Sequence, residues 1–168
     1  MIKMGLRNKG KKTKTELRLE NLLKLKGEKV EVGHFPESGL HYSGMTFPEL
    51  MKLHATGVPS RNIPSRDVLE ILFSNHYDLT KHPDIKKQLS RLIHNAENPR
   101  AVVEFLDEVG RILLEEEVDI FGSNQLAPNK AWVADSKPDG NTPLVDTQEL
   151  VSETSYKNSM TGERVKWR

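Results

Sequence analysis

Apolar side chains recur at three- and four-residue steps between Asn98 and Gly122, a pattern that predicts one long amphipathic helix. Its apolar positions are Val102, Phe105, Leu106, Val109, Ile112, Leu113, Ile120 and Phe121. Asn98 can cap the first turn, and Pro99 loses no hydrogen bond at the next position. Gly122 can end the helix in a left-handed conformation. We expect this helix, about 98–122, to be the scaffold of the domain.

Shorter patterns of the same kind predict further helices on its N-terminal side. The predicted helices run from Thr13 to Gly27, from Thr46 to Gly57, from Ser65 or Arg66 through Phe73, and from Asp84 to Ala96. Thr46 and Glu49 have the spacing of a capping box, and Asp146 with Glu149 has the same spacing before one more helical turn. The helix ending at Ala96 and the long helix can pair as a hairpin, because their connection is short.

Alternating patterns predict a small antiparallel sheet. The predicted strands are 28–35, a returning strand 40–45 that would complete a hairpin, and two later strands at 152–156 and 163–167. Residues 123–143 are rich in Pro, Asn, Asp and Gly and predict a long surface loop. The fold class expected is α+β, with the sheet packed against several helices. Residues 1–27 form a basic N-terminal arm and helix, and 28–168 form a single domain.

Charge is distributed unevenly along the chain. Residues 1–29 contain ten Lys or Arg and three Glu, a net charge of +7; since the whole chain sums to +1, the remainder carries −6. Such an arm can bind nucleic acid, a membrane surface or an acidic protein. It can also be a solubilising tail, or pair with the acidic face of another copy. Its candidate contact residues are Lys9, Lys11, Lys12, Lys14 and Arg18.

Composition excludes several kinds of chemistry. The 168 residues contain no cysteine, so disulfides and thiolate metal sites are excluded. No apolar run approaches the length of a membrane span, so we expect a soluble protein without a membrane partner. The six histidines do not form a zinc-protease motif, and His34 with His41, on either side of the predicted hairpin bend, is the one pair worth testing as metal ligands.

The remaining candidates do not suggest catalysis. Ser43 precedes Gly44 but lacks the glycine two residues earlier that a nucleophile elbow needs. The run Glu115-Glu116-Glu117 is interpreted as a solvated helix face, since adjacent carboxylates point in different directions on a helix. Neither phosphate-binding glycine motif occurs. We therefore expect no catalytic residue, no metal, no cofactor and no enzymatic activity.

Three groups of short motifs follow one another along the chain. The first group is Val32-Gly33-His34-Phe35-Pro36, Gly44-Met45-Thr46, His54-Ala55-Thr56-Gly57 and Ile63-Pro64-Ser65-Arg66-Asp67-Val68-Leu69. The second is Leu126-Ala127-Pro128, with Lys137 after it, and the third is Pro143-Leu144-Val145-Asp146-Thr147-Gln148-Glu149-Leu150, leading to Ser155-Tyr156. In this order and spacing, residues 30–157 resemble the tail-completion or head–tail joining proteins of long-tailed bacteriophages, also called virion morphogenesis or minor tail proteins. Differences at Ala55, Thr56, Asp67 and Gln148 indicate a divergent member.

The resemblance implies an α+β structural protein of the virion neck. Such proteins form rings that complete the tail or join it to the head, around the channel through which DNA passes. The motif positions implied as structural are Gly33, His54, Gly57, Pro64, Arg66, Pro128, Pro143, Asp146 and Thr147. From the residues alone, Arg66 can either pair with a carboxylate such as Asp146 or extend over the surface, and Asp146 is expected to cap a helix.

The expected partners follow from this resemblance. They are other copies of the chain in a hexameric or dodecameric ring, neighbouring connector, tail-terminator or tail-tube proteins, and DNA in the channel. The expected location is the head–tail junction of the virion, and the host cytoplasm during assembly. The alternative hypothesis is a nucleic-acid-binding accessory protein that contacts phosphates through its basic arm, and the third is an unrecognised hydrolase.

Overall fold

The computed structural model describes residues 11–76, 78–130, 143–144 and 148–168. Six α-helices lie in these ranges: α1 (Lys14–Leu23), α2 (Phe47–Thr56), α3 (Val68–Asn75), α4 (Pro83–Asn95), α5 (Ala101–Ile120) and α7 (Glu149–Glu153). Three strands accompany them: β1 (Val30–Gly33), β2 (Ser155–Asn158) and β3 (Arg164–Lys166). The predicted α+β class with a small antiparallel sheet is confirmed.

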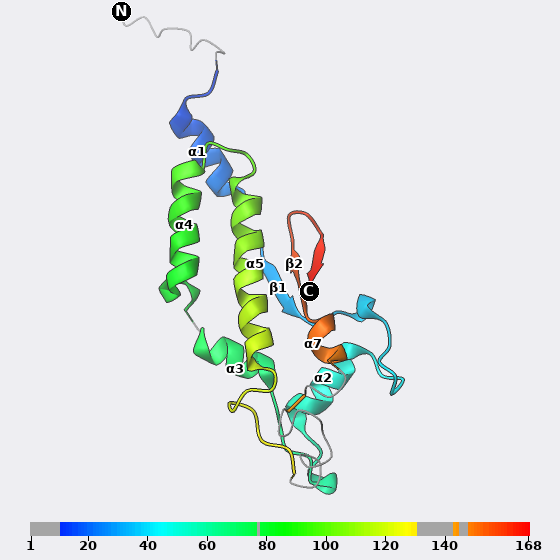
Figure 1. Cartoon of the computed structure of the whole chain (residues 1–168). Helices are drawn as coiled ribbons and strands as arrows, with labels where there is room; N and C mark the ends of the chain where they lie inside the picture. Colours follow the sequence, from blue (N-terminus) through cyan, green and yellow to red (C-terminus); the bar gives the residue numbers. More distant parts are fainter. Residues whose placement is uncertain (1–10, 77, 131–142, 145–147) are drawn as a thin grey trace, which may run out of the picture.

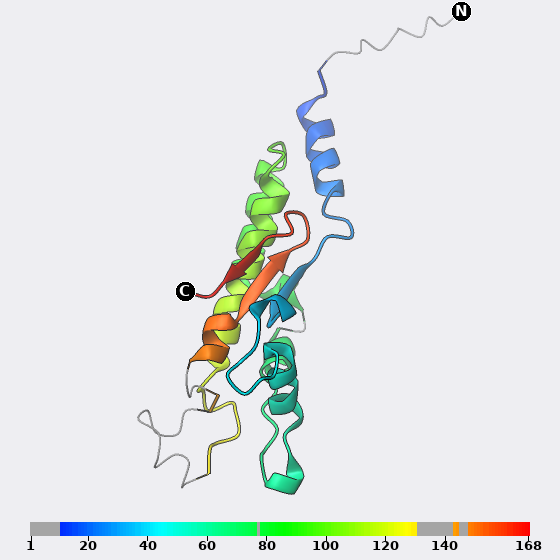
Figure 2. The same cartoon turned by 90° about the vertical axis from the view of Figure 1, so that its right-hand side faces the viewer.

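Helix α5 is the central element of the described structure. In Figure 1, α4 lies along one side of α5 and the sheet lies along the other, while α1 is near one end of α5 and α2 and α3 are near the opposite end. The view in Figure 2 shows the three strands crossing the face of α5. The apolar stripe of α5 is therefore covered along its length by different elements in turn.

Three groups of buried side chains follow α5 from its beginning to its end. Val102 and Leu106 pack with Leu92 of α4. Farther along, Ile112 and Leu113 pack with Ile85 of α4 and with β1 residues. The last group joins the end of α5 to α2 and α3; it contains Phe47, Leu50, Met51, Val68, Leu72, Ile120, Phe121, Leu126, Leu144 and Leu150. The periodicity of α5 thus organises a continuous core.

The sheet has the order β1-β2-β3, with both pairs antiparallel. Val30 pairs with Asn158 and Tyr156 pairs with Val165. The predicted returning strand at 40–45 is therefore wrong. The chain after β1 instead forms a 3₁₀ turn at Pro36–Ser38, and the segment beyond it makes only an isolated bridge between Leu40 and Thr46. β1 takes its partner from the far end of the chain.

Several helix ends differ from the predicted ones. α5 is shorter than 98–122: the Asn98 side chain accepts a hydrogen bond from the Arg100 N–H at 3.0 Å, so it closes a turn ahead of the helix. Gly122 has φ +73°, and its N–H donates to the carbonyl of Pro143. α3 begins at Val68 and not at Ser65 or Arg66, because the carboxylate of Asp67 accepts from the Glu70 N–H and caps it.

Capping chemistry accounts for the other helix starts. Thr13 and Thr46 form the capping boxes of α1 and α2, and the prediction for Thr46 is confirmed. α4 is capped by His82, whose side chain accepts hydrogen bonds from the N–H groups of Asp84 and Ile85. The predicted cap at Asp146 lies outside the described residues. Where the structure does describe this end, α7 follows Gln148, which has a left-handed backbone and makes no side-chain cap.

Among the described helices, none has both the length and the apolar character needed to cross a lipid bilayer.

Candidate interaction site

The Arg66 side chain joins two segments that are distant in sequence. Its Nε donates to the carbonyl of Ala127 at 2.7 Å, and its Nη2 donates to the carbonyl of Pro128 at 2.8 Å and to Oδ1 of Asn129 at 3.1 Å. The residue is 8% exposed, and burial lowers the pKa of its guanidinium. The alternative in which Arg66 extends over the surface is therefore wrong. Asp146, its other predicted partner, lies outside the described residues.

The end of α2 lies against the segment that contains Ser65 and Arg66. The backbone N–H of Arg66 donates to the carbonyl of His54 at 2.7 Å, and the Ser65 hydroxyl donates to the carbonyl of Ala55. Gly57 has φ +66°, and a Cβ atom there would lie 2.7 Å from the Ile63 oxygen. Only glycine fits this turn without displacing backbone. The turn at Gly57 therefore lets the chain reverse direction after α2, so that Arg66 lies against the end of this helix.

The predicted motif positions thus fall into two groups in space. His54, Gly57, Pro64, Arg66 and Pro128 lie around the turn after α2. Gly33 belongs to β1 instead, where its carbonyl accepts a hydrogen bond from the Ser155 hydroxyl, and Pro143 contacts Gly122 at the end of α5. Asp146 and Thr147 lie outside the described residues.

A surface pocket of about 330 Å³ opens beside Arg66. Its lining comes from α2, the segment around Tyr42, Asn129 and the start of α7. Tyr42 is 73% exposed at this pocket, and Leu40, two residues earlier, is 68% exposed. Two large apolar side chains thus face solvent beside the motif cluster. We define Leu40, Tyr42 and this pocket as the candidate interaction site.

One arrangement in this pocket resembles a hydrolytic triad. The Ser43 hydroxyl lies 2.8 Å from His41 Nδ1, and His41 Nε2 lies 3.4 Å from a Glu149 carboxylate oxygen. The nearby amides are already used, however: the Ser43 N–H donates to His41 Nδ1 and the Gly44 N–H donates to the His41 carbonyl. An oxyanion hole needs free donors beside the nucleophile. The contacts instead stabilise a tight turn.

His34 and His41, the pair considered as metal ligands, have separate partners. His34 Nε2 is 2.7 Å from the Leu150 carbonyl, and burial lowers the pKa of its imidazole. His41 is bonded to Ser43 instead. Both rings contact the ring of Phe47. They act as packed polar side chains in the described structure.

The described part of the basic arm makes intramolecular ion pairs. Lys12 pairs with Glu20, and Lys14 and Arg18 approach Glu97 at 3.7 and 3.8 Å. Lys11 is exposed, and Lys9 lies outside the described residues. These exposed pairs reduce the positive potential available to phosphates, although each is weak.

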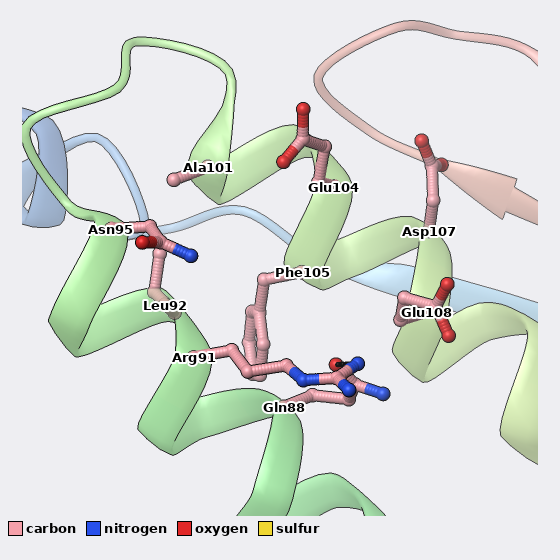
Figure 3. Close-up of a pocket in the computed structure, with 9 residues that line it drawn as sticks. All are labelled: Gln88, Arg91, Leu92, Asn95, Ala101, Glu104, Phe105, Asp107 and Glu108. Atoms are coloured by element: carbon pink, nitrogen blue, oxygen red, sulfur yellow. Dashed lines mark hydrogen bonds between the residues drawn. The ribbon is translucent and has the colours of Figure 1, made fainter.

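A second surface pocket, of about 380 Å³, lies between α4 and α5 (Figure 3). Phe105 fills part of the space between the helices, and Arg91 donates to Gln88 at 3.2 Å. Of the acidic residues that line it, Asp107 accepts a hydrogen bond from Asn158 of β2 at 2.8 Å. This carboxylate therefore has a structural role, as it attaches the sheet to α5.

Glu117 was missed by the sequence analysis, which assigned it to a solvated face. It is fully buried, and neither carboxylate oxygen has a hydrogen-bond partner in the described structure. Desolvation raises the pKa of this carboxyl to about 8. The signal was present in the sequence: Glu117 follows Leu113 by four residues and precedes Ile120 by three, so it lies on the buried stripe.

No family model, curated protein or solved structure matches this chain.

Proposed function

We propose that the protein is a structural subunit of the neck of a long-tailed bacteriophage, where copies assemble into a ring at the head–tail junction. The motif resemblance motivates this proposal. Five of its positions, His54, Gly57, Pro64, Arg66 and Pro128, belong to segments up to 74 residues apart and lie together around one turn. If this chain shares the fold of the family, its motifs should lie together in space, and these five positions do.

The observation that carries the assembly proposal is the exposure of Leu40 and Tyr42 beside that unit. Two large apolar side chains on a turn held by polar contacts gain stability when another surface covers them. In a cyclic ring each subunit presents one surface to the next, so a single such site is repeated at every interface. The proposed occupant of the site is the adjacent subunit.

The experiment measures the mass of the full chain by light scattering after gel filtration and images the particles by negative-stain electron microscopy. We expect rings, hexameric or dodecameric. Tyr42→Ser and Leu40→Ser should shift the population to monomers, because they remove apolar contact area without touching the core. Ile93→Ser is the matched control: Ile93 is 53% exposed on α4, which lies across α5 from the turn in Figure 1. A wild-type monomer at high concentration that also fails to bind isolated tails would overturn the proposal.

The same preparations distinguish the nucleic-acid alternative. A monomer that binds duplex DNA with a steep salt dependence, and loses binding on deletion of residues 1–14, would favour an accessory protein that contacts phosphates. The ring proposal predicts that this deletion does not change assembly through the exposed Tyr42 turn, as measured by gel filtration.

A further inference from the structure

Three potential metal ligands converge where the end of α3 and the start of α4 meet α5. They are His76, the residue that ends α3, His82, which caps α4, and Glu116 of α5. One ligand atom from each lies within 4.8 Å of the others. We propose that these side chains bind a divalent transition-metal cation of the zinc type. The proposal is independent of the proposed neck function.

The carboxylate of Glu116 contacts both imidazole rings, whose centroids are 5.0 Å apart. His76 Nε2 is 2.8 Å from one of its oxygens, and His82 Nε2 is 2.6 Å from the other. The contact with His82 is a hydrogen bond, whereas the oxygen facing His76 is buried and has no partner with hydrogen-bond geometry. His76 and Glu116 thus approach closely without the alignment of a donor and an acceptor. This carboxylate oxygen is therefore available as a ligand for a cation.

The donor set and spacing suit zinc. Two imidazole nitrogens and one carboxylate oxygen are ligands that Zn²⁺ prefers, while Mg²⁺ prefers oxygen alone. Tetrahedral zinc with bonds of about 2.0–2.2 Å places its ligand atoms roughly 3.3–3.6 Å apart. The two nitrogen–oxygen contacts are shorter, so a bound ion widens them by roughly 0.5–1 Å. Small side-chain rotations can supply this change at His76 and Glu116, whose side chains are 21% and 28% exposed.

An ion can reach the cluster from solvent. A small surface pocket of about 180 Å³ contains two of the three side chains in its lining; the lining residues are Leu72, Asn75, His76, Glu116, Asp119, Ile120 and Gln125. Three protein ligands leave the fourth position of a tetrahedral ion for water. Asp119, which lines the same pocket, adds negative charge that favours a cation.

Metal binding has a defined consequence for His82. Its Nδ1 faces the backbone N–H groups of Asp84 and Ile85 at 3.2 and 3.4 Å, so Nδ1 is an acceptor and Nε2 carries the proton that is donated to Glu116. A cation on Nε2 displaces that proton, and the neutral ring then carries its proton on Nδ1. Binding therefore changes the tautomer of His82 and weakens a cap whose contacts are already long.

The test is a calorimetric titration of the full chain with ZnCl₂, with MgCl₂ as the comparison. We expect one equivalent of Zn²⁺ to bind and no heat from Mg²⁺. His76→Gln, Glu116→Gln and His82→Asn should each weaken binding at least about tenfold. Asparagine at position 82 retains an acceptor that can cap α4. His94→Gln is the matched control: it removes a histidine of α4 whose Nδ1 contacts the Ser90 carbonyl, away from the cluster.

A second measurement covers the case in which a variant fails to fold. Long-range ¹⁵N–¹H NMR of the wild-type imidazoles should show His82 protonated at Nε2 before zinc is added and at Nδ1 afterwards, with His76 shifting at the same equivalence point. Three results would each overturn the proposal: no zinc binding by the wild type, a loss of zinc affinity in His94→Gln equal to that in the cluster variants, or zinc-dependent shifts confined to other histidines. The cluster would then be an ion-free contact in which Glu116 orients two rings.

Discussion

Gly110 of α5 lies directly against the ring of Tyr156 on β2. A Cβ atom at position 110 would be 2.3 Å from Cδ2 of that ring and 2.7 Å from Cγ. These atoms are at the base of a ring that is only 6% exposed, so neighbouring side chains restrict its displacement. The absence of a side chain at Gly110 therefore sets how closely the sheet packs on the helix.

Gly110→Ala should destabilise the protein despite the better helix propensity of alanine. The propensity gain is about 1 kcal/mol, whereas overpacking a tight contact costs about 1–3 kcal/mol or more. We expect a net loss of stability of up to about 2 kcal/mol, measured by urea unfolding. Glu104→Ala, at an exposed position of the same helix, should be nearly neutral. The double variant Gly110→Ala/Tyr156→Ala should lose less stability than the sum of the losses of the two single variants. Additive losses would contradict a clash between the new methyl group and the ring.

The buried carboxyl of Glu117 makes stability depend on pH in a defined direction. Its pKa is 4.5 in an unfolded chain and about 8 in the fold. Between these values the folded state binds more protons, so the free energy of unfolding falls as pH rises through this range and becomes level above it. The total decrease in the free energy of unfolding is on the order of 5 kcal/mol, which is an upper estimate for a fully desolvated group.

Glu117→Gln isolates this effect, because glutamine has similar volume and does not ionise. The variant should lack the fall in stability that Glu117 causes between about pH 5 and about pH 8, and it should be more stable than the wild type at the alkaline end. Thermal unfolding across that range provides the measurement. Glu104→Gln should follow the wild-type profile, since Glu104 is exposed. A wild-type profile that rises toward about pH 9 would show that Glu117 is not buried as described.

Local signals predicted the parts of the fold that depend on neighbouring residues. The capping box at Thr46 is confirmed because its partner, Glu49, is three residues away. The pairing of β1 was predicted incorrectly, because its partner strand is more than 120 residues away and the nearer segment also alternates. Short alternating stretches do not specify which strand they pair with.

The candidate sites were harder to predict, since their partners lack a sequence signature. Arg66 binds two backbone carbonyls, which every residue possesses. His76, His82 and Glu116 come together only because α3, α4 and α5 pack as they do. By contrast, helical periodicity alone could have placed Glu117 on the buried stripe.

Arg66→Lys should weaken the attachment of residues 127–129 to the turn after α2. Lysine keeps the charge but cannot donate from two nitrogens to the two carbonyls at once. Because these are buried hydrogen bonds from a charged group, we expect a loss of about 2–3 kcal/mol in urea unfolding. Arg61→Lys, at an exposed position, should change little. Equal effects in the two variants would show that the contacts of Arg66 do not contribute to stability.

Gly57 and Gly39 form a matched pair for testing the turn beneath α2. Both have positive φ, +66° and +88°, but a Cβ at Gly57 would lie within 2.8 Å of three backbone atoms, while a Cβ at Gly39 would meet nothing within 4 Å. Gly39→Ala should therefore cost only the conformational strain, about 1–3 kcal/mol. Gly57→Ala should cost about 1–3 kcal/mol more, because backbone must move to admit the methyl group.

Displacement of that backbone should also weaken the Arg66 contacts, so the stability losses of Gly57→Ala and Arg66→Lys should be less than additive in urea unfolding. Equal costs at the two glycines would contradict the close approach at Gly57.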